Sequence, residues 1–175
     1  MNKIFLLFFA YLALLLSCRK EKKPKVDFTY TGTLSAIKNG INWSAKVRFV
    51  NENDSIYIEA NVYNEFNYLR KTLAFFKIPK TIGIHLLKKF TPLNNLTSST
   101  YGTSQDDGDV SCDNFTLDTL RMNNYIKVTS IDNIAKTIRC EFVSTYFIDN
   151  ISGRKCNPNE VDTIKFTNGI IQGSF

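Results

Sequence analysis

Large apolar and small polar residues alternate along most of the chain after the first 27 positions. Over residues 28–34 threonine alternates with Phe28, Tyr30, Gly32 and Leu34, and over residues 43–49 Trp43, Ala45, Val47 and Phe49 fall on one face. A period of two is typical of β-strands with one buried face. Asn39-Gly40, between these two segments, predicts a tight hairpin because both residues accept a positive φ.

The same pattern continues to the C-terminus. Further strands are expected over residues 56–63, 72–78, 82–90, 100–105, 125–131, 137–149 and 161–175, with polar loops over 51–54, 91–99, 106–114 and 150–159. Asp132-Asn133 predicts a second hairpin, and residues 115–122 are ambiguous. No helical periodicity follows the first segment. The sequence therefore predicts an all-β fold, either an antiparallel β-sandwich or a partly closed β-barrel of about eight to ten strands.

The first segment, residues 1–17, has a different pattern. Lys3 precedes the uncharged and mostly apolar run 4–16, which ends at Ser17. A positive start, a short apolar stretch and a small residue are typical of a secretory signal peptide. As a helix, the run would rise only about 20 Å against the roughly 30 Å of a bilayer's hydrocarbon core. A transmembrane anchor is therefore the less favoured interpretation.

Leu15-Leu16-Ser17-Cys18 resembles the lipobox of bacterial lipoproteins. The resemblance implies that the thiol of Cys18 takes up a diacylglyceryl group, that the chain is cut just before it, and that the new amine is acylated. The predicted organisation is a signal peptide over 1–17, a lipidated basic tether over 18–26 and one all-β domain over 27–175. Two or three acyl chains would hold the protein firmly, since one binds a membrane only marginally. An ordinary secretory signal with an accidental cysteine is the alternative.

Composition and charge narrow the classes of function. The 175 residues are 43% hydrophobic and 22% charged, which is typical of a globular protein. The formal net charge is +6, but residues 19–25 carry +4 of it, and residues 26–175 hold 16 Lys and Arg against 15 Asp and Glu. The basicity therefore belongs mostly to the tether, where it can meet anionic lipid headgroups. A nucleic-acid partner is not expected.

The β-domain contains three cysteines, Cys112, Cys140 and Cys156. Their spacing matches no CxxC metal or redox motif, and in an oxidising compartment two of them are expected to pair. Cys112 and Cys156 fall in expected polar loops, so the prediction is a Cys112–Cys156 disulfide, with Cys140 buried in a strand as a small apolar residue. Three unpaired thiols or a different pairing are the alternatives.

Other candidate chemistry is sparse. His85, the single histidine, is expected to be half-exposed on a strand, and zinc would need partners that no local spacing supplies. Asp106-Asp107-Gly108-Asp109 offers oxygens for calcium but lacks the ligand spacing of an EF-hand, so a solvated acidic turn is favoured. A pair of carboxylates for glycoside hydrolysis would depend on a separation that only the folded structure sets, so the sequence does not identify one. No catalytic residue, metal or cofactor is predicted.

Tyr57 and Tyr63 form one candidate ligand face. They are expected on the side of their strand opposite its apolar residues, with Glu59 and Asn61 between them. Aromatic rings beside polar groups can stack on sugars or meet a protein partner. The alternative is that this face belongs to a second buried layer of a sandwich.

Three segments resemble a family of small Bacteroidetes lipoproteins grouped as a domain of unknown function. TGTLSAIKNGINWSAKV is similar to its A-x-x-NG-x-x-W-x-A start, IKVTSIDNIAKTIRCEFVSTYF to its central hairpin, and TNGIIQGSF to its closing T-x-G-x-F strand. Cys140 stands where that family usually has glycine. The resemblance implies an all-β, lipid-anchored envelope protein of unassigned activity and carries over no catalytic residues. In such lipoproteins acidic residues after the cysteine favour export to the cell surface, so Arg19 and Lys20 favour an outer-membrane location facing the periplasm.

The leading hypothesis is a non-enzymatic, lipid-anchored envelope domain that acts through protein or envelope contacts. A module that binds a glycan or small ligand through exposed tyrosines or a barrel mouth is the alternative. A small envelope hydrolase, which would use paired carboxylates or an activated His85, is the third hypothesis.

Overall fold

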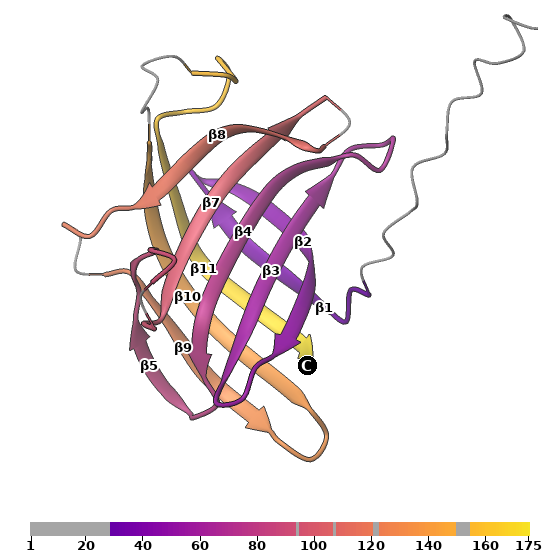
Figure 1. The fold of residues 1–175 in the computed structure, drawn as a ribbon, viewed down its shortest axis with the longest axis vertical. Coiled ribbons are helices and arrows are strands. Elements are labelled where there is room, and N and C mark those ends of the chain that lie inside the picture. The colour runs from indigo at the N-terminus through magenta and orange to yellow at the C-terminus, as the bar shows by residue number, and fades with distance from the viewer. Residues whose placement is uncertain (1–28, 94, 107, 121–122, 150–154) are drawn as a thin grey trace, which may run out of the picture.

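The computed structural model describes residues 29–93, 95–106, 108–120, 123–149 and 155–175. The predicted signal peptide, Cys18 and the tether lie outside these residues. The described chain is all-β, and its strands join one sheet (Figure 1). The strands are β1 Gly32–Lys38, β2 Ile41–Asn51, β3 Ser55–Tyr63, β4 Leu69–Pro79, β5 Gly83–Leu86, β6 Lys88–Lys89, β7 Ser98–Gln105, β8 Val110–Leu117, β9 Tyr125–Asp132, β10 Thr137–Ile148 and β11 Thr163–Ser174. No helix among the described residues is long and apolar enough to cross a bilayer.

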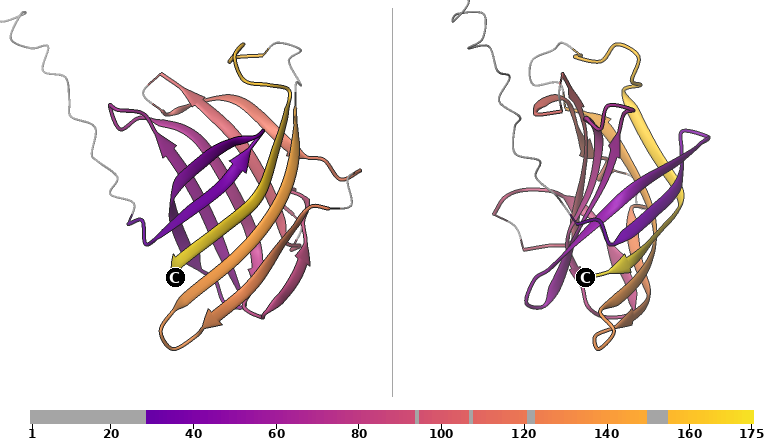
Figure 2. Two further views of the ribbon diagram at one scale, coloured as in Figure 1. Left: turned by 180° about the vertical axis from the view of Figure 1, so that it is seen from behind. Right: turned by 90° about the vertical axis from the view of Figure 1, so that its right-hand side faces the viewer.

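Eight of the strands close into an antiparallel barrel. The order around the ring is β1-β2-β3-β4-β7-β8-β10-β11, and β11 pairs with β1 to complete it. Figure 2 shows the closing wall from behind, where β1, β11 and β10 lie side by side. Closure removes the free sheet edges that an open sandwich leaves. The all-β prediction is confirmed, with the barrel as the observed architecture.

β10 shares one of its edges between two partners. Its residues 146–148 pair with β8, whereas its residues 137–143 pair with β9. β9 then pairs with β5, and β6 lies parallel to the start of β7. β8 therefore pairs with the C-terminal end of β10, whereas β9, followed by β5, extends the sheet along the rest of that edge.

The predicted β1–β2 hairpin is confirmed. Asn39 and Gly40 have φ values of 48° and 84°, as the turn requires. In the β9–β10 hairpin the carboxylate of Asp132 accepts hydrogen bonds from the backbone N–H groups of Ile134 and Ala135, each at 2.8 Å. The Asp132 side chain thus accepts hydrogen bonds from turn N–H groups that have no backbone acceptor.

Two expectations about individual segments are wrong. The strand expected over 82–90 is divided at Leu87, whose side chain turns inward and is buried. The polar loop expected over 106–114 ends early, because β8 begins at Val110, and Cys112 lies in this strand. Ser111 and Asn114 face solvent while Asp113 is buried, so no apolar alternation marks the start of β8.

Aromatic rings fill the middle of the barrel. The ring of Phe166 on β11 contacts the rings of Trp43, Tyr101, Phe142 and Tyr146, with centroids 5.1–6.2 Å apart. Fully buried aliphatic residues surround this group: Leu34, Val47, Ile56, Ile58, Leu73, Ile78, Ile126, Ile164 and Ile171. The barrel therefore has a packed core.

Candidate functional site

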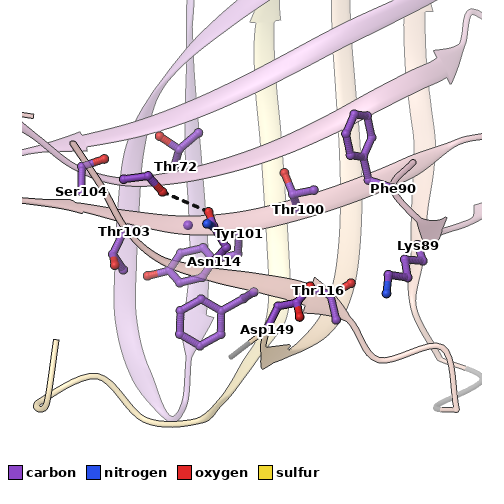
Figure 3. A pocket seen from close by; sticks show the side chains of 13 residues that line it. Thr72, Lys89, Phe90, Thr100, Tyr101, Thr103, Ser104, Asn114, Thr116 and Asp149 are labelled. Carbon is purple, nitrogen blue, oxygen red and sulfur yellow. Dashed lines mark hydrogen bonds between the residues drawn. The ribbon is translucent and has the colours of Figure 1, made fainter. Parts of the chain in front are cut away.

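A groove of about 430 Å³ crosses the outer surface of β7 and β8. It lies on the outside of the barrel, because most of its lining side chains face outward and alternate along β7 and β8 with Tyr101 and Phe115, which also border the groove but are buried. Figure 3 shows Lys89 and Phe90 at one end of the groove and Ser104 at the other. We refer to it as the β7–β8 groove.

The β7–β8 groove is lined mainly by neutral hydrogen-bonding groups. Its outward-facing polar residues are Thr72, Thr100, Ser104, Ser111, Asn114 and Thr116, together with Lys89 and Asp149. The chain after β10 joins this edge where the backbone N–H of Asp149 donates to the carbonyl of Asn114 at 2.8 Å. Hydroxyl and amide groups beside an aromatic wall can bind a polyhydroxylated ligand.

Phe90 continues an aromatic row over the outer wall. Its ring stacks on Phe76 of β4 with centroids 4.2 Å apart, and Phe76 contacts the ring of Tyr57 on β3 at 5.1 Å. The guanidinium of Arg48 lies 6.0 Å from the centre of the Tyr57 ring. The row therefore joins the predicted tyrosine face to one end of the β7–β8 groove.

Tyr57 and Tyr63 both lie on the outer face of β3, and the described part of the chain forms no second sheet over them. The hydroxyl of Tyr57 donates to Glu59 at 3.1 Å, and the hydroxyl of Tyr63 shares a hydrogen bond with that of Tyr30. Burial is the first cause that raises the pKa of Tyr57 and Tyr63. Both hydroxyls therefore form hydrogen bonds with neighbouring side chains of the protein, while the ring of Tyr57 extends the aromatic row.

A second polar cluster occupies one end of the barrel interior. The ammonium of Lys38 donates to the hydroxyl of Tyr101 at 2.9 Å and also to the carboxylate of Glu160. The ammonium of Lys71 lies 3.1 Å from the other oxygen of Glu160. Glu160 is brought in by the loop 155–162, which leads into β11 (gold in Figure 1).

The loop 155–162 is fastened to the start of β8. The predicted Cys112–Cys156 disulfide is present, with a Cα–Cα distance of 5.3 Å. The carboxylate of the buried Asp113 accepts hydrogen bonds from the backbone N–H groups of Cys156 and Asn157, at 2.8 and 2.9 Å. Together, these contacts hold Glu160 over the ammonium groups.

Burial and pairing act in opposite directions on this cluster. Burial lowers the pKa of Lys38 to about 8, although its hydrogen bond to Glu160 acts the other way. Burial alone would raise the pKa of Glu160, but the hydrogen bonds and charges of Lys38 and Lys71 outweigh it and keep that pKa below its usual value. The pair therefore stays ionised near neutral pH.

Replacing Glu160 with glutamine should destabilise the protein by about 2 kcal/mol at neutral pH, since the buried ammonium of Lys38 and the partly exposed ammonium of Lys71 lose their counter-charge. The folded pKa of Glu160 lies below its ordinary value of 4.5. Its contribution is therefore complete above that pH and is lost as the pH falls through the folded pKa. Urea unfolding at about pH 7 and about pH 3 should show the difference between wild type and E160Q shrinking in acid.

The control is Glu141→Gln. Glu141 and Lys127 form an exposed pair at 4.0 Å, so E141Q should change stability by less than about 0.5 kcal/mol at either pH. A difference between wild type and E160Q that stays constant from neutral to acid pH would contradict this interpretation of Glu160.

The other residues with candidate chemistry are a histidine, a free cysteine and an acidic turn. His85 lies half-exposed on β5, as predicted, with Nε2 3.2 Å from the carbonyl of Thr81. Cys140 is a buried free thiol, also as predicted. Asp106 and Asp109 flank the β7–β8 turn, while Asp107 lies outside the described residues. Among the described residues, no three His, Cys, Asp or Glu side chains gather in a metal-binding arrangement.

The β7–β8 groove is not apparent from the sequence. Its hydroxyl residues are separated in the chain and fall on strands as ordinary outward positions. Phe90 sits next to Lys89 in a segment that was expected to be one continuous strand. Only the pairing of β7 with both β4 and β8 brings these groups together. No local pattern could have indicated that convergence.

No family model, no curated protein and no solved structure matches this chain. The geometry of the groove and of the closed barrel, together with the N-terminal sequence pattern, therefore carries the functional interpretation.

Proposed function

We propose that the protein is a non-enzymatic, lipid-anchored module of the bacterial cell envelope that acts through contacts on the outer surface of its barrel. Cys18 is the proposed lipid attachment site, at the outer membrane and facing the periplasm. The lipobox-like residues 15–18 and the resemblance to small Bacteroidetes lipoproteins support this proposal.

The packed interior is the observation that carries this proposal. A barrel that holds a ligand inside needs a lumen, and here the rings around Phe166 occupy that space. On the outer wall, by contrast, polar side chains and the aromatic row are accessible. Contacts with a partner are therefore assigned to the outside.

The disulfide supports the proposed compartment. Cys112 and Cys156 are bonded although Cys112 belongs to a strand, and such bridges persist in oxidising compartments such as the periplasm. A nearly neutral β-domain also suits contact with envelope components more than binding to nucleic acid.

A second candidate function is glycan binding at the β7–β8 groove. The groove offers hydroxyl, amide and carboxylate groups, and Phe90 supplies a ring against which a sugar can stack. These groups can hydrogen-bond to a saccharide without any catalytic chemistry.

The test is a glycan array probed with the mature protein, followed by titration of any bound glycan. If the groove is the site, removing Asn114 and Asp149 together (N114A/D149A) should weaken binding by about tenfold or more, because each lost hydrogen bond contributes about 1 kcal/mol. The matched control is Thr33→Ala, an exposed threonine on β1, which should leave binding unchanged.

The outcomes separate the two candidates. Binding that resists N114A/D149A would exclude the groove, and an array without any hit would exclude glycan binding. Turnover of glycan, ester or peptide substrates by the mature protein would overturn the non-enzymatic proposal itself.

A further inference from the structure

The hairpin tip between β3 and β4 presents two aromatic rings to solvent. Phe66 is 68% exposed and Tyr68 is 42% exposed, and their ring centroids are 6.4 Å apart. The guanidinium of Arg70 lies 5.8 Å from the centre of the Tyr68 ring. Figure 1 shows this hairpin projecting at the upper right of the barrel. Exposed aromatic rings at a projecting tip are available for contact with another surface.

The backbone of this tip is well ordered by its own hydrogen bonds. The side-chain oxygen of Asn64 accepts from the N–H groups of Phe66 and Tyr68, at 3.1 and 2.9 Å. The N–H of Asn64 also donates to the carbonyl of Tyr68 at 3.0 Å, and Asn67 adopts a φ of 62°. The backbone that carries the two exposed rings is therefore fixed, which lowers the entropy cost of contact.

The start of the described chain is joined to the strand that leads into this tip, and it lies below the tip in Figure 1. The hydroxyl of Tyr30 pairs with that of Tyr63, the residue just before Asn64, and their ring centroids are 6.0 Å apart. The side-chain amide of Asn61 also donates to Tyr30 at 3.3 Å. Tyr30 therefore ties the chain that precedes β1 to the last residues of β3, just before the hairpin tip.

The length of the preceding segment limits the distance to the proposed anchor. Ten residues, 19–28, lie between Cys18 and Thr29, and the eleven Cα–Cα steps that join these two residues span about 40 Å at most when fully extended. The basic residues of the tether are also attracted to anionic headgroups, which favours conformations near the membrane. Tyr30 and the end of β3 are thus limited to a distance of about 40 Å from Cys18, within which the tip can reach the bilayer that holds the anchor.

We propose that Phe66 and Tyr68 form a membrane-contact tip that enters the interfacial region of the bilayer in which Cys18 is anchored. The inference rests on the proposed lipidation of Cys18. Aromatic rings partition favourably to the headgroup level of bilayers. Glu65 lies in the tip and Asp106 lies near it, where its carbonyl accepts from Arg70 at 2.9 Å. The contact therefore relies on the rings, and the tether supplies the attraction to anionic lipid.

The test places a tryptophan at the tip. Lipidated protein carrying Phe66→Trp is reconstituted into phosphatidylethanolamine and phosphatidylglycerol vesicles whose acyl chains are brominated. The added emission should shift to the blue and fall by about half, because the ring reaches the bilayer interface. Trp43 is partly buried on the inner side of the barrel and gives a constant background.

The matched control is Ile134→Trp. Ile134 is 96% exposed in the β9–β10 turn, at the bottom of the barrel in Figure 1, so its added emission should not be quenched. Mass spectrometry of the same samples establishes whether Cys18 carries lipid. Lipidated protein in which F66W is quenched no more than I134W would overturn the membrane-contact tip and leave the anchor standing. Absence of lipid on Cys18 would overturn both.

Discussion

Phe166→Ala is expected to lower the free energy of unfolding by about 4 kcal/mol, the largest effect of any single substitution considered. The Phe166 ring is fully buried and contacts four other rings from β2, β7 and β10. These rings belong to strands on different sides of the barrel, so they cannot all move inward to fill the space that alanine would leave. The lost burial and the remaining cavity both contribute to the cost.

Guanidinium unfolding followed by circular dichroism measures this effect. The matched control is Phe147→Ala: Phe147 lies on the outer face of β10 and is 45% exposed, so the cost should be below about 1 kcal/mol. Equal effects of F166A and F147A would show that the rings around Phe166 do not form a packed core.

Loss of the Cys112–Cys156 disulfide is expected to lower stability by roughly 4 kcal/mol. The bridge closes a segment with a sequence separation of 44 residues, and its removal returns conformational freedom to the unfolded chain. The double substitution C112S/C156S should therefore unfold at a lower urea concentration than the wild type. Release of the loop 155–162 would also loosen Glu160 from Lys38, which adds to the effect.

Cys140 provides the control for the disulfide. Cys140→Ala keeps the bridge, so C140A should lose stability under a reducing agent as the wild type does, whereas C112S/C156S should be insensitive to it. A wild-type protein equally stable in its oxidised and reduced forms would contradict the proposed stabilisation.

Local chemistry explains which parts of the fold could be predicted. Asn39-Gly40 and the alternation around Val47 are local signals, and the structure contains the expected hairpin with Val47 fully buried. Closure of the barrel is not local: it pairs Gly32 with Gly173 across nearly the whole described chain. Sandwiches and barrels share the same alternation, so the choice between them depends on such distant pairs.

The same limit applies to the candidate site. Tyr57 was recognised because it stands opposite an apolar face, and it does lie on the outer wall. The β7–β8 groove could not be recognised, since Thr116 and Asn114 have no sequence feature that distinguishes them from other polar strand positions. Glu160 and Lys38 were likewise missed, because an ion pair between residues 122 positions apart forms only when the barrel closes.

Lipidation of Cys18 is the claim on which the proposed location, the membrane-contact tip and the envelope role all depend. The direct measurement is mass spectrometry of the protein isolated from membranes of cells fed labelled palmitate. We expect an N-terminal peptide that begins at Cys18 and carries acyl chains, and no label in the variant Cys18→Ala. An unlabelled protein that retains residues 1–17, or that is cut at another position, would contradict the account.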